Sequence, residues 1–143
     1  MKRGFTLIEL LVALGIMALI AAISFVFLSP SAAKGRDARR EADIKSIQGA
    51  LNLYINQKGG YPVCAAETVI DGSNDCLSSV LLSEGTIQSV PLDPKYIGTS
   101  ACGGANSFVY CYQSSDGISY TIRYQLETDS VPQKSAGWQI INP

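Results

Sequence analysis

An uncharged stretch near the N-terminus constrains this chain most. Between Glu9 and Lys34 there is no charged residue. Its most apolar part, Leu10–Leu28, has 19 residues and would measure about 28 Å as a helix. The hydrocarbon core of a bilayer is about 30 Å thick, so this segment is long enough to cross a membrane. The remainder of the 143 residues has room for one small domain and not for two separate cores.

Basic residues flank this stretch on both sides. Lys2 and Arg3 precede it, which favours an N-terminus that stays in the cytoplasm. The residues that follow it are also basic, and they oppose the same rule: Lys34, Arg36, Arg39 and Arg40. Something more specific than charge bias must therefore set the orientation.

Two ordinary explanations compete for the apolar segment. One is a secretory signal peptide cut near residues 31–33, but the segment is longer than the usual apolar region of about 7–15 residues and an acid stands at its start. The other is a plain anchor helix, which has no use for Glu9. A carboxylate at the edge of a membrane span costs on the order of 2–3 kcal/mol.

A partner for Glu9 has to come from elsewhere, because no base lies on the same apolar face. If the chain were cut after Gly4, Phe5 would acquire a free α-amino group. A second copy, shifted along its axis by a few residues, could place that cation against Glu9, and a paired charge is tolerated in a helix bundle where an isolated one is not. We therefore expect Glu9 to set the register of an assembly.

Residues 2–12, Lys-Arg-Gly-Phe-Thr-Leu-Ile-Glu-Leu-Leu-Val, resemble the N-terminal motif of type IV pilins and type II secretion pseudopilins. The match is continuous over about the first 28 residues. The resemblance implies that a prepilin peptidase of the inner membrane cuts after Gly4, that Phe5 becomes a methylated terminus, and that Glu9 is the acid of the motif. It also implies self-assembly into a helical polymer, driven by an inner-membrane assembly platform and an ATPase motor.

The chain is thus divided into a leader (residues 1–4), a transmembrane and filament-core helix (5–28), an amphipathic continuation of the stem (29–58) and a head (59–143). Pro30 should bend the helix or break it locally; alternatively it ends the membrane helix and a new one starts near Lys34. Both readings stay open.

The second part of the stem has one apolar stripe, formed by Ile44, Ile47, Leu51 and Tyr54. Acids interleave with the bases of 36–43, which predicts a solvated, ion-paired face with an Arg39–Asp43 pair. Contact with lipid headgroups or with a neighbouring subunit is the alternative. The glycines of Gly59-Gly60-Tyr61-Pro62 should end the helix.

The head reads as a small antiparallel sheet. We expect strands at 107–113 and 118–127, joined by a turn at 114–117, and a third strand at 136–142. In the second strand Tyr120, Ile122, Tyr124 and Leu126 alternate with polar residues. A short helix or turn is expected at 77–82. A long helical stem packed against this sheet gives an α+β fold.

All four cysteines lie beyond the expected stem, as two sequence-local pairs. The chain has no histidine, so a zinc site would need all four thiolates at unusual spacings. Free thiols in a reducing cytosol fit poorly with a membrane segment. We expect disulfides instead, with short loops favouring two pairs: Cys64–Cys76 and Cys102–Cys111.

The residues 90–96, Val-Pro-Leu-Asp-Pro-Lys-Tyr, are similar to the stretch before the sheet in major pseudopilins, although Lys95 stands where an aromatic residue is usual. Because loop aspartates bind calcium in those proteins, the resemblance makes several loop residues calcium candidates by type: Asp93, Asp116 and Asp129, together with Asp71, Asn74 and Asp75. No EF-hand spacing exists, and such residues are more often turn formers. We expect no other cofactor.

The sequence offers no catalytic constellation, since it lacks histidine, a G-x-S-x-G motif and a glycine-rich phosphate loop. A net charge of −1, or −3 without residues 1–4, gives no reason to expect direct nucleic-acid binding. We therefore expect a non-enzymatic subunit of a surface pilus used for adhesion, motility or DNA uptake. The alternatives are a type II secretion pseudopilin and a lone membrane-anchored binding domain. The precursor would wait in the inner membrane and then enter a cell-surface or periplasmic filament.

Overall fold

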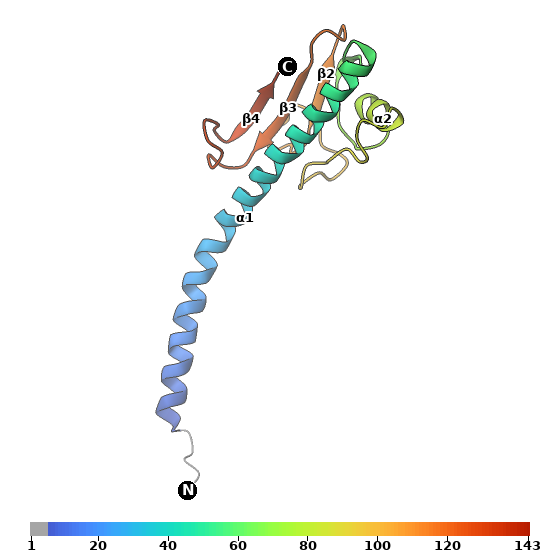
Figure 1. Cartoon of the computed structure of the whole chain (residues 1–143). Helices are drawn as coiled ribbons and strands as arrows, with labels where there is room; N and C mark the ends of the chain where they lie inside the picture. Colours follow the sequence, from blue (N-terminus) through green and yellow to red (C-terminus); the bar gives the residue numbers. More distant parts are fainter. Residues whose placement is uncertain (1–5) are drawn as a thin grey trace. The chain divides into compact units, whose positions relative to one another are not determined.

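The computed structural model describes residues 6–143, apart from the side chains of residues 25–30. It is an α+β structure with a long N-terminal helix, as the sequence predicts (Figure 1). Its elements are α1 (Leu7–Lys58), β1 (Cys64–Val69), α2 (Cys76–Ser83), β2 (Cys111–Ser114), β3 (Thr121–Leu126) and β4 (Gly137–Ile141). By internal contacts the chain divides into two units, Met1–Ala33 and Lys34–Pro143. Each is described by itself.

Helix α1 is assigned without interruption through Pro30. The alternative in which Pro30 ends one helix and a second starts near Lys34 is therefore wrong. A proline removes only its own N–H donor, and every other backbone group of an apolar segment is still best satisfied by a helix.

In the second unit, the later part of α1 lies on one face of the sheet (Figure 1). Ile44, Ile47 and Leu51 are buried there, and Tyr54 packs at the edge of the same core. This is the stripe that the helical spacing predicts. The buried partners on the strands include Tyr112, Ile122, Tyr124 and Leu126.

The four strands form one sheet in the order β1-β2-β3-β4, and every neighbouring pair is antiparallel. Alternation along β3 is as expected, because Ile122, Tyr124 and Leu126 are buried and the residues between them are not. Strands β3 and β4 lie inside the expected ranges and are shorter than expected. Strand β2 starts four residues later than expected and includes Ser114, which was expected in the turn.

Sequence reasoning missed strand β1. Its residues, Cys-Ala-Ala-Glu-Thr-Val, show no apolar alternation, and its pairing with β2 is interrupted by an irregularity between Cys64 and Thr68. A bulged edge strand is held by its partner's backbone more than by its own side-chain pattern. Helix α2 was expected as a short helix over the core, and it buries Leu77 and Leu81.

Two glycines allow the chain turns near the end of α1: Gly59, which follows the helix, and Gly117, in the β2–β3 turn. Helix α1 ends at Lys58, and Gly59 takes a φ of +78°, a left-handed conformation that suits the residue after a helix. In the β2–β3 turn, the carbonyl of Gly117 accepts a 2.7 Å hydrogen bond from the Tyr61 N–H. A Cβ on Gly117 would lie 3.1 Å from the Tyr61 carbonyl oxygen, so this approach requires glycine.

Candidate functional site

The first turn of α1 is a capping box built from Thr6 and Glu9. The Thr6 hydroxyl accepts a 3.3 Å hydrogen bond from the Glu9 N–H. In return Glu9 Oε2 accepts from the Thr6 N–H at 2.9 Å and from the Thr6 hydroxyl at 2.8 Å. Two donors at the helix start, which the helix itself cannot satisfy, thus find partners three residues apart.

This cap leaves part of Glu9 unused. All three hydrogen bonds use Thr6 Oγ1 or Glu9 Oε2, so Oε1 takes no part in the cap. Both residues also follow the predicted cut site, so removing residues 1–4 would leave the cap in place. Gly4 and Phe5, the predicted processing residues, lie outside the residues that the structure describes.

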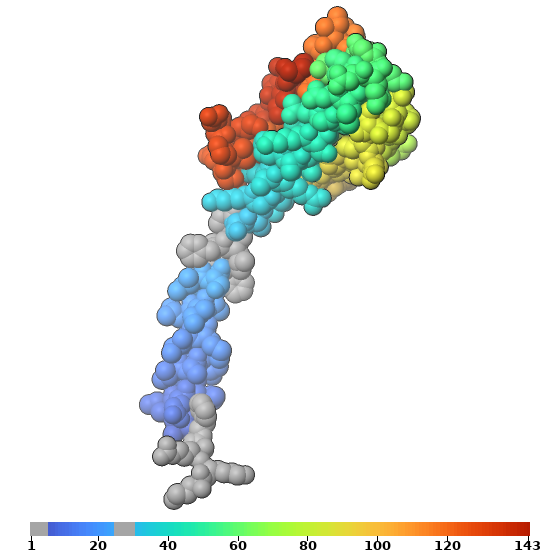
Figure 2. All heavy atoms as spheres, viewed as in Figure 1, coloured from blue at the N-terminus to red at the C-terminus, as the bar shows by residue number. Residues whose placement is uncertain are grey.

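The stem that follows the cap exposes its apolar side chains. Its large hydrophobic residues from Leu7 to Ile23 are between 53% and 81% exposed, and the visible face of the segment is open in Figure 2. The window Leu7–Ser24 has a mean hydropathy of 2.5 and is long enough to cross a membrane. Such a surface has to be covered by lipid or by other apolar helices, because water would not tolerate a patch of this size.

The one described serine hydroxyl of residues 7–24 is hydrogen-bonded within the helix. The Ser24 hydroxyl donates to the Ile20 carbonyl oxygen at 2.9 Å, one turn earlier. Inside membrane helices, where there is no water, a serine hydroxyl commonly donates its hydrogen bond to a backbone carbonyl one turn earlier.

In the second unit, helix α1 carries a fully buried arginine, Arg40. Arg40 donates to both carboxylate oxygens of Asp93, at 2.7 and 3.0 Å. Its Nη1 also donates to Asp37 at 2.7 Å and to Glu127 at 2.8 Å. We call these four residues the Arg40 cluster. The cluster ties α1 to the loop between α2 and β2 and to the end of β3. It corrects the expectation of a solvated face here.

The cluster extends to the neighbouring side chains. Glu127 also accepts a 2.7 Å hydrogen bond from Arg36 Nε. The guanidinium carbon of Arg40 lies 4.8 Å from the centre of the Phe108 ring. The hydrogen bond from Arg36 lowers the pKa of Glu127 to about 2, with Arg40 and Lys95 contributing and burial opposing. Such pairing is what makes buried charges tolerable. The expected Arg39–Asp43 pair is present, at 3.9 Å and with an exposed arginine.

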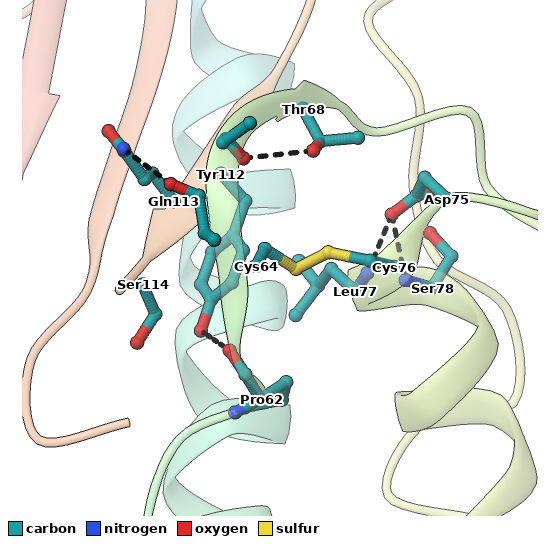
Figure 3. Close-up of a disulfide and its surroundings, with 12 residues drawn as sticks. Pro62, Cys64, Thr68, Asp75, Cys76, Leu77, Ser78, Tyr112, Gln113 and Ser114 are labelled. Carbon is teal, nitrogen blue, oxygen red and sulfur yellow. Dashed lines mark hydrogen bonds between the residues drawn. A yellow bond between two sulfur atoms is a disulfide. The ribbon is translucent and has the colours of Figure 1, made fainter. Parts of the chain in front are cut away.

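Two disulfides staple the head. Cys64 is bonded to Cys76 and Cys102 to Cys111, the connectivity expected from the short loops. Figure 3 shows the first of them joining β1 to the start of α2, beside Asp75, whose carboxylate accepts from the N–H groups of Leu77 and Ser78. The bond therefore holds an edge strand and a short helix together at a capped helix start.

The three main calcium candidates are not brought together. Asp93 faces Arg40, Asp116 accepts from the N–H of Ile118 at 2.9 Å, and Asp129 accepts from the N–H of Ala136 at 2.6 Å. The remaining candidates stabilise the turn before α2, where one oxygen of Asp71 accepts from the N–H groups of three residues: Ser73, Asn74 and Asp75. Each of these carboxylates thus has a turn, cap or ion-pair role.

Within residues 6–143, one group of three potential metal ligands lies close together, namely Glu67, Cys102 and Cys111. Both cysteines are oxidised to the disulfide, so neither offers a thiolate to a metal. Glu67 instead pairs with Arg123 at 3.1 Å.

Sequence reasoning missed two residues that hold these regions in place. Thr6 could have been found, because Thr-x-x-Glu before an apolar run is the spacing of a capping box. Arg40 could not, since its partners Asp93 and Glu127 are 53 and 87 residues away in the chain.

Comparison with known proteins bears on the N-terminus. Residues 1–25 match the family model described as the prokaryotic N-terminal methylation motif. No curated protein and no solved structure matches the chain. These matched residues include the capped acid Glu9 and most of the exposed apolar helix. Residues 1–25 carry the signature of type IV pilins and pseudopilins, which indicates a pilin-type structural subunit rather than an enzyme.

Proposed function

We propose that this chain is the structural subunit of a type IV pilus-like filament, trimmed after Gly4 and assembled through its apolar stem. The observation that carries the proposal is the methylation motif on a stem whose large apolar side chains from Leu7 to Ile23 are all more than half exposed. Before assembly, lipid of the inner membrane covers this surface. In the filament, the stems of other copies replace the lipid.

Glu9 favours the assembled filament over the isolated subunit in the membrane. In the single subunit its carboxylate is half used, because Oε2 caps the helix and Oε1 takes no part in the cap. In the filament, Oε1 accepts from the α-amino group of Phe5 on a neighbouring copy. A charge that is only partly compensated in the membrane is fully paired in the assembly, so pairing favours the filament over the isolated subunit.

The head supports a surface location. Two disulfides close loops on a small domain, a feature typical of domains that function in oxidising surroundings. In this proposal the prepilin peptidase processes the N-terminus, and the inner-membrane platform and the ATPase motor assemble the trimmed subunit. The head then decides what the surface fibre adheres to, or whether it serves motility or DNA uptake.

The second candidate is a major pseudopilin of a type II secretion system. It was favoured by the Asp93-Pro94 stretch and its link to loop calcium. Because Asp93 is bound by Arg40, that stretch has a structural role which suits either kind of filament. The stretch therefore does not favour the pseudopilin over the pilus.

Shearing intact cells separates the two candidates. The released material is examined by electron microscopy and probed for this chain, with a strain lacking the gene as the control. Long fibres that contain the chain and vanish in the deletion strain are expected for a surface pilus. A trimmed chain that stays with the cells, with no sheared fibres, would support the pseudopilin instead.

Replacing Gly4 with valine tests the processing step. The bulkier side chain should block cleavage, so the precursor accumulates at full length and no fibres form. A chain shortened normally in this variant would refute the proposed cut site.

A further inference from the structure

The basic run after the membrane stretch is only partly used by the head. Arg36 and Arg40 both form ion pairs with Glu127, and Arg39 pairs with Asp43. Lys34 and Lys45 remain exposed, and no carboxylate of residues 6–143 lies within 4.0 Å of either ammonium group. The head gives these two charges no partner.

These two lysines border one groove. Lys34, Ala38, Glu41 and Lys45 follow one another on a single face of α1, at helical spacings of four, three and four residues. The loop Ser130–Lys134 forms the opposite wall, and the groove encloses about 600 Å³. It lies wholly within the second unit.

The groove carries excess positive charge. Three lysines line it, whereas Glu41 is the one carboxylate in its lining. Glu41 is already taken by Lys134, with both carboxylate oxygens 2.8 Å from Nζ. Apolar side chains line the groove as well, from Ala38, Val131 and Pro132. A ligand that fits must bring a compact negative charge together with apolar atoms.

We propose that this groove binds the phosphodiester headgroup of an anionic phospholipid while the subunit is still in the membrane. This inference rests on the membrane-anchored stage of the proposed function. In the sequence, Lys34 follows Ser24, the last residue of the membrane-spanning window, by ten positions. The phosphate supplies an anion to lysines that have no carboxylate partner, and the apolar residues of the lining receive the glycerol end of the lipid.

The lipid is a better occupant than a second copy because of where these charges stand. They follow the span on the side where positive residues oppose the usual topology rule, so orientation gives no reason to keep them. Anionic headgroups attract lysines at a membrane surface, and this attraction is a reason to place lysines there.

The test uses the full chain in nanodiscs of equimolar phosphatidylglycerol and phosphatidylcholine, with native mass spectrometry of the lipids it retains. Wild type should retain phosphatidylglycerol in excess. The Lys34→Gln/Lys45→Gln variant should lose at least about fivefold of that preference, the effect expected for one lysine at an anionic surface. Lys58→Gln is the matched control, because Lys58 lies at the far end of α1 and pairs with Glu84. It should behave as wild type.

Equal retention of both lipids by wild type, or an equal loss in the Lys58→Gln control, would overturn the headgroup site. So would carbodiimide cross-links from Lys34 or Lys45 to a second copy, which would assign the groove to subunit contact. Acetylation of both lysines is followed in phosphatidylcholine nanodiscs with added inorganic phosphate. Protection there equal to that given by phosphatidylglycerol would mean a site for free anions. A chain recovered outside the nanodiscs would contradict the membrane stage itself, and with it both proposals.

Discussion

Arg40 and Asp93 face each other as a two-pronged ion pair, with Nε and Nη2 of the arginine 2.7 and 3.0 Å from the two carboxylate oxygens. Neither side chain is exposed to solvent. The pair joins the first buried turns of α1 to the loop between α2 and β2. Around residues 37–40 of α1 the head is therefore held together by ion pairs. Further along the same helix it is held by the apolar packing of Ile44, Ile47 and Leu51.

Replacing Arg40 with methionine should destabilise the head by about 3–5 kcal/mol, because the carboxylates of Asp37, Asp93 and Glu127 would lose the cation they share. Thermal unfolding of the full chain in detergent, followed by near-ultraviolet circular dichroism, measures the loss. Arg39→Met is the control: that arginine is 70% exposed, so the change should be within about 0.5 kcal/mol. Equal melting temperatures for the two variants would contradict the account.

Acid should weaken the same region through Glu127. Its pKa in the folded chain is about 2, below the ordinary value of 4.5, chiefly because Arg36 donates to it. The stabilisation from a lowered pKa is complete above the unfolded value and is lost as the pH falls toward the folded one. Asp43 acts in the opposite sense, since burial raises its pKa.

The melting temperature should therefore fall between about pH 5 and about pH 2, and Glu127→Gln should show a shallower fall over that window. The measurement is a series of melting curves of both chains across this range. Parallel curves for wild type and variant would show that Glu127 does not carry the acid sensitivity.

Each disulfide should stabilise the head by about 2–4 kcal/mol, since each closes a short loop of the unfolded chain. Replacing Cys64 and Cys76 together with serine should free the edge strand β1 from α2. The matching double variant at Cys102 and Cys111 should free the loop before β2 instead. Peptide mapping without reductant checks the pairing, and thermal unfolding checks the energy. Double variants with the same melting temperature as wild type would show that the disulfides do not stabilise the head.

Glu9 has two roles that substitution can separate. Glutamine keeps the capping geometry, because a capping box accepts Glu or Gln at this position, but it removes the charge. If charge pairing sets the register, Glu9→Gln and Glu9→Ala should both be cleaved normally and both fail to form fibres. Thr6→Ala is the control, since it weakens the cap by about 1 kcal/mol and leaves the charge. Normal fibre yield from Glu9→Gln would show that the cap alone matters.

Local patterns were enough to predict the stem and most of the sheet. The apolar stripe of α1 and the alternation of Ile122, Tyr124 and Leu126 repeat at the period of their own element, so a short window contains them. Burial of Arg40 depends on residues 53 and 87 positions away, and no window contains both ends of such a contact. Strand β1 was missed for a related reason, because its place is set by pairing with β2.

The central claim, a pilin-type subunit trimmed before assembly, is tested most directly by the intact mass of the chain in sheared or membrane fractions, with sequencing of its N-terminal peptide. We expect a chain that has lost residues 1–4 and begins at Phe5 with one methyl group on its α-amino nitrogen. A chain that still begins at Met1, or one cut near residues 31–33 by a signal peptidase, would contradict it.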